Sequence, residues 1–315
     1  MAGLALPLPP LLYKRPMRNK KFGKDFGKGR RPGPEKSRGN PGKKPERASA
    51  GSTGPKPTHA TAQAERPQTG GNFRGGGQWL YGLHAVQAAL ANPRRKLGRA
   101  VLTPRAVETI GEKLLKRVRV EIMEPGAIDR LLPPGAVHQG AALEASPLKS
   151  PELDEILEAA APGRRIVLVL DQLSDPHNVG AILRTAAAFG VTAVVVQDRH
   201  APPQSGALAK AASGALDQVP YIEVVNISRA LDQLAERGFW RIALAGDGES
   251  SLAEAVPVGD VALVLGSEGD GIRRLVREHC EASAFIPIDR SVESLNVSNA
   301  AAIALYELRR AGTSA

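Results

Sequence analysis

The sequence predicts an α/β protein whose larger part is built on a parallel β-sheet. Two apolar runs, Ile166–Leu170 and Val261–Leu265, are typical of strands that are buried on both faces of such a sheet. Between and after them, strand patterns alternate with helical patterns, which indicates a doubly wound sheet. Because 42% of the residues are hydrophobic but only 4% are aromatic, the core must consist mainly of Ala, Val, Leu and Ile.

The larger part is expected to cover residues 164–315. Its other strands are predicted at Ala193–Val196, Tyr221–Val225, Arg241–Ala245 and Ala284–Ile286. Helices are predicted at Asn178–Phe189, Ser228–Arg237, Ile272–Glu278 and Val297–Arg310. Ligands of doubly wound sheets bind at the carboxyl ends of the strands, so the loops that follow the strands are the candidates for function.

A smaller α/β unit is expected over residues 78–147, followed by a linker over 148–163 that contains a short helix, Glu152–Ala159. Its helices are predicted at Gly82–Leu90, Val107–Arg117 and Ile128–Leu132, and its strands at Arg99–Leu102, Val118–Met123 and Gly140–Ala145.

The net charge of +10 is concentrated in the first 77 residues. This segment carries 17 Lys and Arg against 4 Asp and Glu, whereas the rest of the chain has 25 against 28. Rich in Gly, Pro and Ser, it is expected to be a disordered basic tail. It is either an electrostatic arm for RNA, with Phe22 and Phe26 stacking on bases, or a solubilising tail without a defined partner; its charge density favours the arm.

Several classes of protein are excluded by composition. Cys280 is the only cysteine, so the chain has no internal disulfide. No apolar run approaches the roughly 18 residues that cross a bilayer, so no membrane partner is expected. The six histidines show no ligand spacing, and no metal site is expected.

The first unusual loop follows the strand at Ile166–Leu170. Its Asp175-Pro176 pair forces a turn, and Asn178 then stands at the start of a helix, where free N–H groups face any anion. Arg184 is expected on the second turn of that helix, within reach of the same crevice. The simpler alternative makes Asn178 a helix cap and Arg184 a surface residue.

Two further loops follow strands near the end of the chain. Gly266–Gly271 holds three glycines, which permit positive φ and close approach of a ligand to the backbone. It matches neither a Walker loop nor a dinucleotide fingerprint. Glu268 within it is either an acid at a helix start or a residue that orients substrate. The third loop follows the predicted strand Ala284–Ile286. In the simplest account, its Ser294 or Asn296 is a cap of the last helix.

Taken together and in this order, the three loops resemble the SpoU/TrmH family of the knotted SPOUT RNA methyltransferases. The first motif corresponds to Asn178–Arg184, the second to Gly266–Gly271 and the third to Ile286–Ser298. The smaller unit is similar to the ribosomal-protein-L30e-like RNA-binding module, and its segments Gly82–Leu90 and His138–Gly140 resemble those of bacterial 23S rRNA guanosine 2′-O-methyltransferases.

The resemblance implies a trefoil knot, a homodimer, a cytoplasmic location and an RNA substrate that is methylated from S-adenosylmethionine. It places backbone groups near Gly266, Ile286 and Leu295 around the cofactor. It also implies that the reaction site is lined by the following residues: Asn178, Arg184, Glu268, Ser294 and Asn296.

An arginine is a poor proton acceptor because its reference pKa is about 12.5–13.8. Arg184 is therefore expected to stabilise the developing alkoxide of a ribose hydroxyl, while Ser294 and Glu268 fix Arg184 or the loops and the two asparagines position ribose or phosphate. Two alternatives stay open at this point: an RNA-binding protein without catalysis, and a methyltransferase that acts on tRNA or at another position of rRNA. The appended smaller unit favours ribosomal RNA.

Overall fold

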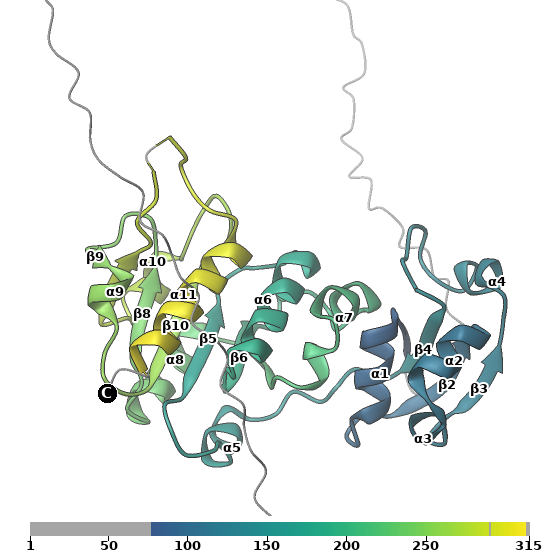
Figure 1. Ribbon diagram of the computed structural model, residues 1–315. Helices are drawn as coiled ribbons and strands as arrows, with labels where there is room; N and C mark the ends of the chain where they lie inside the picture. The colour runs from purple at the N-terminus through teal and green to yellow at the C-terminus, as the bar shows by residue number, and fades with distance from the viewer. Residues whose placement is uncertain (1–76, 290, 313–315) are drawn as a thin grey trace, which may run out of the picture. The chain divides into compact units, whose positions relative to one another are not determined.

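The computed structural model describes residues 77–289 and 291–312, which form two β-sheets with helices packed on them (Figure 1). The predicted basic tail lies outside the described residues apart from Gly77. The predicted α/β class with a parallel sheet is confirmed.

The smaller sheet has the strand order β1-β4-β2-β3 and combines antiparallel with parallel pairing. Its strands are β1 (Gln78–Tyr81), β2 (Leu97–Leu102), β3 (Arg119–Ile122) and β4 (Ala141–Ala145). Its helices are α1 (Leu83–Ala91), α2 (Pro104–Ile110), α3 (Glu112–Leu115) and α4 (Pro125–Asp129).

Three details of this unit differ from the sequence prediction. Strand β1 was not predicted, because it has only four residues after a glycine run, too few to show an alternating apolar pattern. The single helix expected at Val107–Arg117 is two helices, since Gly111 takes φ 84° between them. Helix α4 begins three residues earlier than the expected helix, with Pro125 in its first turn.

The larger sheet has seven strands in the order β7-β6-β5-β10-β8-β11-β9, and every neighbouring pair is parallel. Its strands are β5 (Ile166–Leu170), β6 (Ala193–Gln197), β7 (Tyr221–Val224), β8 (Trp240–Leu244), β9 (Ser250–Ser251), β10 (Val261–Leu265) and β11 (Ala282–Phe285).

Strand β10 is inserted between two strands that precede it in the chain. It pairs with β5 on one side and with β8 on the other, each time over all five residues. Leu265 is in register with both Leu170 and Leu244, so three strands end in one row. The loops that follow these strands therefore start at the same level of the sheet, at the edge where ligands of such folds bind.

Helices cover both faces of the larger sheet (Figure 1). They are α5 (Leu153–Glu158), α6 (Pro176–Ala188), α7 (Gly206–Ala212), α8 (Ile227–Glu236), α9 (Leu252–Ala255), α10 (Arg274–Arg277) and α11 (Val297–Gly312). The sequence reading did not predict α7, α9 or β9, which are short. Helix α7 consists mostly of Gly and Ala without apolar periodicity, and its start depends on the Ser205 cap. Helix α10 is shorter than expected, since the loop from Gly266 extends to Arg273.

One buried apolar cluster runs from the smaller sheet into one face of the larger sheet. It includes Leu80 and Val86 from the smaller unit together with Leu168 and Ile182 from the larger. In the part of the chain that the structure describes, no helix is both long and apolar enough to cross a membrane, and no three His, Cys, Asp or Glu side chains gather as a metal site.

Burial raises the pKa of the Cys280 thiol to about 12, because desolvation disfavours the thiolate. At pH 8 roughly one thiol in ten thousand is then ionised, and only the thiolate is nucleophilic. We expect an aromatic disulfide reagent to label Cys280 slowly in the native protein and within seconds to minutes in denaturant, as followed by absorbance. Rapid labelling of the native protein would contradict this burial.

Candidate active site

The carboxyl edge of the larger sheet brings the three sequence motifs to one place. The loop after β5 is tied to the end of β10 directly, since the Asp171 N–H donates to the Leu265 carbonyl at 2.8 Å. The loop after β10 begins at Gly266, and the segment that follows β11 leads back to the start of α11. Residues about 90 and 120 positions apart in the chain thereby become neighbours.

Asn178 lies in the first turn of α6, but it is not the cap of that helix. The Asp175 carboxylate caps α6, since it accepts hydrogen bonds from the N–H groups of His177 at 3.0 Å and Asn178 at 3.4 Å. The simpler account of Asn178 as a cap is therefore wrong. Its side-chain amide is free to take part in the site.

Glu268 joins the three motifs through one carboxylate oxygen. Its Oε1 accepts hydrogen bonds from Asn178 Nδ2 at 3.2 Å and from Asn296 Nδ2 at 2.7 Å. Asn296 Nδ2 also lies 3.0 Å from Asn178 Oδ1. We call these residues the amide–carboxylate cluster (Asn178, Glu268 and Asn296). Glu268 and Asn296 are exposed and Asn178 is half-buried, so the cluster lies at the surface of the protein.

The cluster also builds the start of α11. Asn296 Oδ1 accepts from the Ser298 N–H at 3.0 Å and from the Ser298 hydroxyl at 2.6 Å, which makes Asn296 the cap of this helix. Glu268 Oε1 adds a longer bond from the Val297 N–H at 3.4 Å, placing its negative charge at the positive end of the helix. Glu268 thus binds the start of α11 and not the start of α10, which is the next helix along the chain.

Arg184 and Ser294 are not part of the amide–carboxylate cluster. Helix α6 begins at Pro176, so Arg184 lies on its third turn instead of the expected second. Six residues along a helix correspond to about 9 Å of rise and about 120° of rotation from Asn178. The Arg184 side chain is exposed and forms no ion pair or hydrogen bond with any described residue. Ser294 is exposed in the loop before α11 and likewise forms no hydrogen bond with any described residue.

The glycine loop after β10 closes on itself. Ser267 and Gly271 exchange two backbone hydrogen bonds of 3.1 Å, and Gly269 and Gly271 take positive φ of 98° and 68°. A Cβ atom on Gly266 would lie 2.2 Å from the carbonyl carbon of Gly271. A side chain at position 266 would clash with the loop's own backbone, so glycine is required there for the loop to close. The sequence had suggested a different reason, namely the close approach of a ligand to this backbone.

An ion pair between a buried carboxylate and a partly exposed arginine, which the sequence did not point to, attaches this loop to the sheet. Asp171 is fully buried directly after β5, and its carboxylate accepts from the Arg273 backbone N–H and from Arg273 Nε, both at 2.9 Å. Arg273 Nη2 also donates to Gln197 Oε1 at 3.0 Å. The only signal in the sequence was an acidic residue directly after an apolar strand.

The loops after β8, β10 and β11 fit an adenosyl ligand. Gly248 packs against the backbone of β11, since its Cβ would lie 2.5 Å from Ala284. In contrast, Cβ atoms added to Gly246 or Gly269 would meet no atom within 4 Å, which leaves open space beside the backbone. Half-buried Ile286 and Leu295 supply apolar surface, as a purine ring requires. The Gly246 loop was missed in the sequence because it has no recognisable motif.

Comparisons with known proteins agree with this arrangement. Residues 165–306 match the model of the SpoU rRNA Methylase family, and residues 79–151 match that of the RNA 2'-O ribose methyltransferase substrate-binding family. The 23S rRNA (guanosine-2'-O-)-methyltransferase RlmB of Xanthomonas campestris is 39% identical over 242 residues, which cover 74% of this chain and 96% of the relative. The chain belongs to the SpoU rRNA methylase family.

Other relatives and solved structures are similar to this SpoU family member over most of its length. RlmB of Xylella fastidiosa strain Temecula1 is 40% identical, with 75% of this chain and 97% of the relative covered. A TrmH-family putative RNA methyltransferase structure from Porphyromonas gingivalis has a TM-score of 0.62 at 27% identity, covering 76% and 91% of the two chains. The SpoU methyltransferase AviRb from Streptomyces viridochromogenes has a TM-score of 0.65 at 22% identity, covering 78% and 95%, and shares the fold.

Substituting Asp171→Ala is expected to leave Arg273 without its carboxylate and to release the glycine loop. Because Arg273 is partly exposed, we expect the free energy of unfolding to fall by about 2–4 kcal/mol, at or below the usual range for breaking a buried pair. The measurement is denaturant unfolding at equilibrium. Asp198→Ala, an exposed acid after the neighbouring strand β6, is the matched control and should change stability by less than about 0.5 kcal/mol. Equal losses in both variants would refute this attachment of the loop.

Proposed function

We propose that this protein transfers a methyl group from S-adenosylmethionine to the ribose 2′-hydroxyl of a guanosine in 23S rRNA. The observation that carries the proposal is the meeting of Asn178, Glu268 and Asn296 beside the glycine loop at the carboxyl edge of the sheet. The names of its RlmB relatives, of which this chain covers at least 96%, support the guanosine of 23S rRNA.

Backbone groups around Gly266, Ile286 and Leu295 would hold the cofactor, and we add the loop at Gly246 to them. When bound, S-adenosylmethionine supplies an activated methyl group on a sulfonium. The chain's own residues then have to align a ribose hydroxyl and ease the loss of its proton.

The roles of the reaction-site residues follow from their charges and contacts. Arg184 carries a full positive charge that no acidic side chain of the described residues neutralises, so it is suited to stabilise the ribose alkoxide as it forms. Asn178 and Asn296, held by Glu268, present oriented amide groups to ribose or phosphate. Ser294 lies on the exposed loop before α11, where it can contact Arg184 or the RNA once the site is filled.

Ribosomal RNA is preferred over tRNA and over binding without catalysis. The smaller unit matches a substrate-binding family over residues 79–151, and its relatives carry rRNA names. The Glu268 network brings the three family motifs together at the strand ends, which supports catalysis over binding alone. An rRNA substrate also supports the cytoplasmic location expected from the sequence.

The finer architecture is part of the same proposal. We divide the chain into a basic tail (1–77), an L30e-like RNA-binding domain (78–147), a linker (148–163) and a methyltransferase domain (164–315). Insertion of β10 between β5 and β8, after both have been passed in the chain, supports a trefoil knot.

A homodimer is supported by α11, which exposes Ile303 at 44% and Tyr306 at 59% on adjacent turns. A second copy of the chain is the proposed cover of this apolar face. Light scattering at micromolar concentration should return the mass of two chains, and a monomer mass would contradict the dimer.

Substituting Arg184→Ala tests the proposed chemistry. Without the cation, kcat on a 23S rRNA fragment should fall at least about a hundredfold, the usual effect of removing one transition-state donor. Cofactor affinity by calorimetry should stay within about threefold, because Arg184 is not among the residues assigned to hold the cofactor. Arg229→Ala on α8, an exposed arginine on the opposite face of the sheet, is the matched control and should keep its activity. Turnover of Arg184→Ala close to that of the unmodified protein would overturn the role assigned to Arg184.

A further inference from the structure

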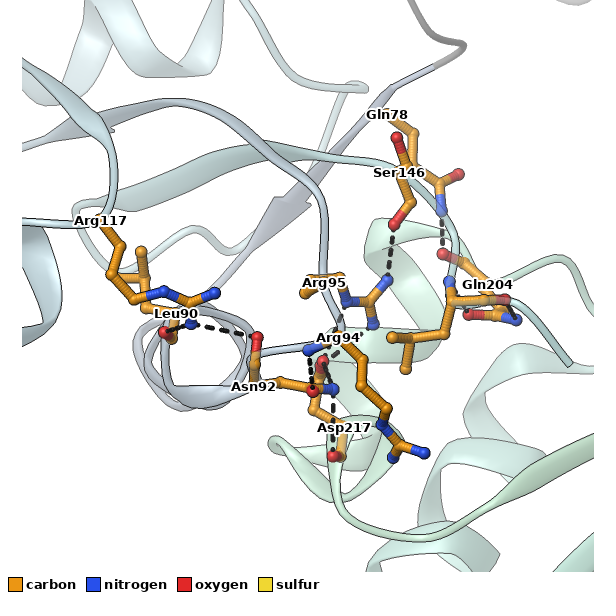
Figure 2. A network of polar contacts seen from close by, with 10 residues as sticks. Gln78, Leu90, Asn92, Arg94, Arg95, Arg117, Ser146, Gln204 and Asp217 are labelled. Atoms are coloured by element: carbon orange, nitrogen blue, oxygen red, sulfur yellow. Dashed lines mark hydrogen bonds and ion pairs between the residues drawn. The ribbon is translucent and has the colours of Figure 1, made fainter. Parts of the chain in front are cut away.

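A seam between the smaller unit and the methyltransferase part contains polar groups that neither the cofactor site nor the reaction site uses. At its centre Asp217, in the short 3₁₀ turn after α7, meets Arg95 from the loop after α1 (Figure 2). Arg95 Nε donates to Asp217 Oδ1 at 2.9 Å, and Arg95 Nη2 donates to Asp217 Oδ2 at 3.1 Å. This is a two-pronged arginine–carboxylate pair, the geometry that fixes orientation most strongly.

The pair is buried and its hydrogen bonds are extended on both sides. The side chains of Arg95 and Asp217 are 0% and 3% exposed. Arg95 Nη1 donates to the Ser146 carbonyl at 3.0 Å, and Asn92 Nδ2 donates to Asp217 Oδ1 at 3.0 Å (Figure 2). Each buried charge therefore has partners, which is the condition under which burial is tolerated.

A second set of bonds closes the same seam at the linker. The Gln204 side chain, buried before α7, exchanges two hydrogen bonds of 2.9 Å with the backbone of Leu148. The Gln78 side chain donates to the Gln204 carbonyl (Figure 2). The entry strand and the exit of the smaller unit are thus both attached to the same stretch of the methyltransferase part.

Glycines let the backbones of three elements touch across the seam. A Cβ atom on Gly206, at the start of α7, would lie 2.4 Å from the Trp79 carbonyl of β1. A Cβ atom on Gly180 of α6 would likewise lie only 2.4 Å from Ala211 Cβ of α7. Helix α7 therefore packs without a gap between the smaller unit and α6, the helix that carries Asn178 and Arg184.

The contacts across this seam are those of a fixed interface between the two units. Domains joined by a linker move relative to one another unless their interface is large and well packed. Here a continuous apolar cluster and backbone contact through glycines act on α7, and a buried ion pair acts on the 3₁₀ turn that follows it. A loose tether would need none of them.

We propose that Arg95 and Asp217 are positioning residues that lock the RNA-binding unit onto the 3₁₀ turn directly after α7, and thereby set the place of the bound RNA relative to α6. This rests on the proposed function. Neither residue touches the reacting groups. Their effect is to bring a ribose held by one unit to the amide–carboxylate cluster and Arg184 of the other, which is catalysis by orientation.

The test compares Asp217→Ala, and Asp217→Asn as the milder variant that keeps an acceptor, with the unmodified full chain. Hydrogen exchange should become at least tenfold faster in β1 and α7. On a 23S rRNA fragment, kcat should fall at least tenfold, while the Kd values for the RNA and for S-adenosylmethionine stay within threefold. Loss of kcat with unchanged Kd values is expected if both units stay folded but are no longer held in the right relative position. Partial unfolding would instead weaken binding and lower kcat together.

Asp260→Ala is the matched control, because Asp260 forms a similar pair with Arg165, at 2.8 Å from Arg165 Nε, at the opposite end of the strands. It should leave kcat and the exchange of α7 unchanged. Faster exchange with an unchanged kcat in Asp217→Ala would overturn the positioning role, and so would unchanged exchange or a parallel loss of cofactor binding. Absence of transfer by the unmodified protein would instead contradict the proposed function.

Discussion

The insertion of β10 between β5 and β8 is the constraint on which the site depends. Parallel pairing on both sides of β10 aligns the ends of three strands at Leu170, Leu244 and Leu265. All five residues of β10 are buried, so both faces of this strand pack against the core. The pairing of the strands therefore places the loops that follow them at one edge of the sheet. Residues within these loops then form the contacts that hold the loops together.

Charges then fix those loops in place. Asp171 and Arg273 attach the glycine loop to the end of β5, and Glu268 at its tip receives amides from α6 and from the start of α11. A single rigid loop thereby sets the orientation of two asparagines that are 118 residues apart. Arg184 stays outside this network, and in the proposed function its charge acts on the substrate. Asn296 both caps α11 and joins the amide–carboxylate cluster, so the start of this helix and the cluster depend on the same side chain.

The sequence was informative where one residue pattern decides one element. Apolar runs located β5 and β10 to the residue, and the glycine and proline pairs located the loops. Asn178, Glu268 and Asn296 could be named together only through the family resemblance, and their contacts depend on the strand order, which periodicity does not encode. Likewise, Arg95 and Asp217 are 122 positions apart, and each alone looks like a solvated surface charge. Helix α7 escaped prediction because its stability comes from packing through Gly206 and not from an apolar stripe.

The central claim is that the loops after β8, β10 and β11 hold the methyl donor beside the amide–carboxylate cluster. A crystal structure with S-adenosylhomocysteine tests it most directly. We expect the adenosyl group against Ile286 and Leu295 and the backbone at Gly246 and Gly266, with the sulfur facing Asn178, Glu268 and Asn296. A ligand bound at another edge of the sheet, or a sulfur that faces away from these three side chains, would contradict the account.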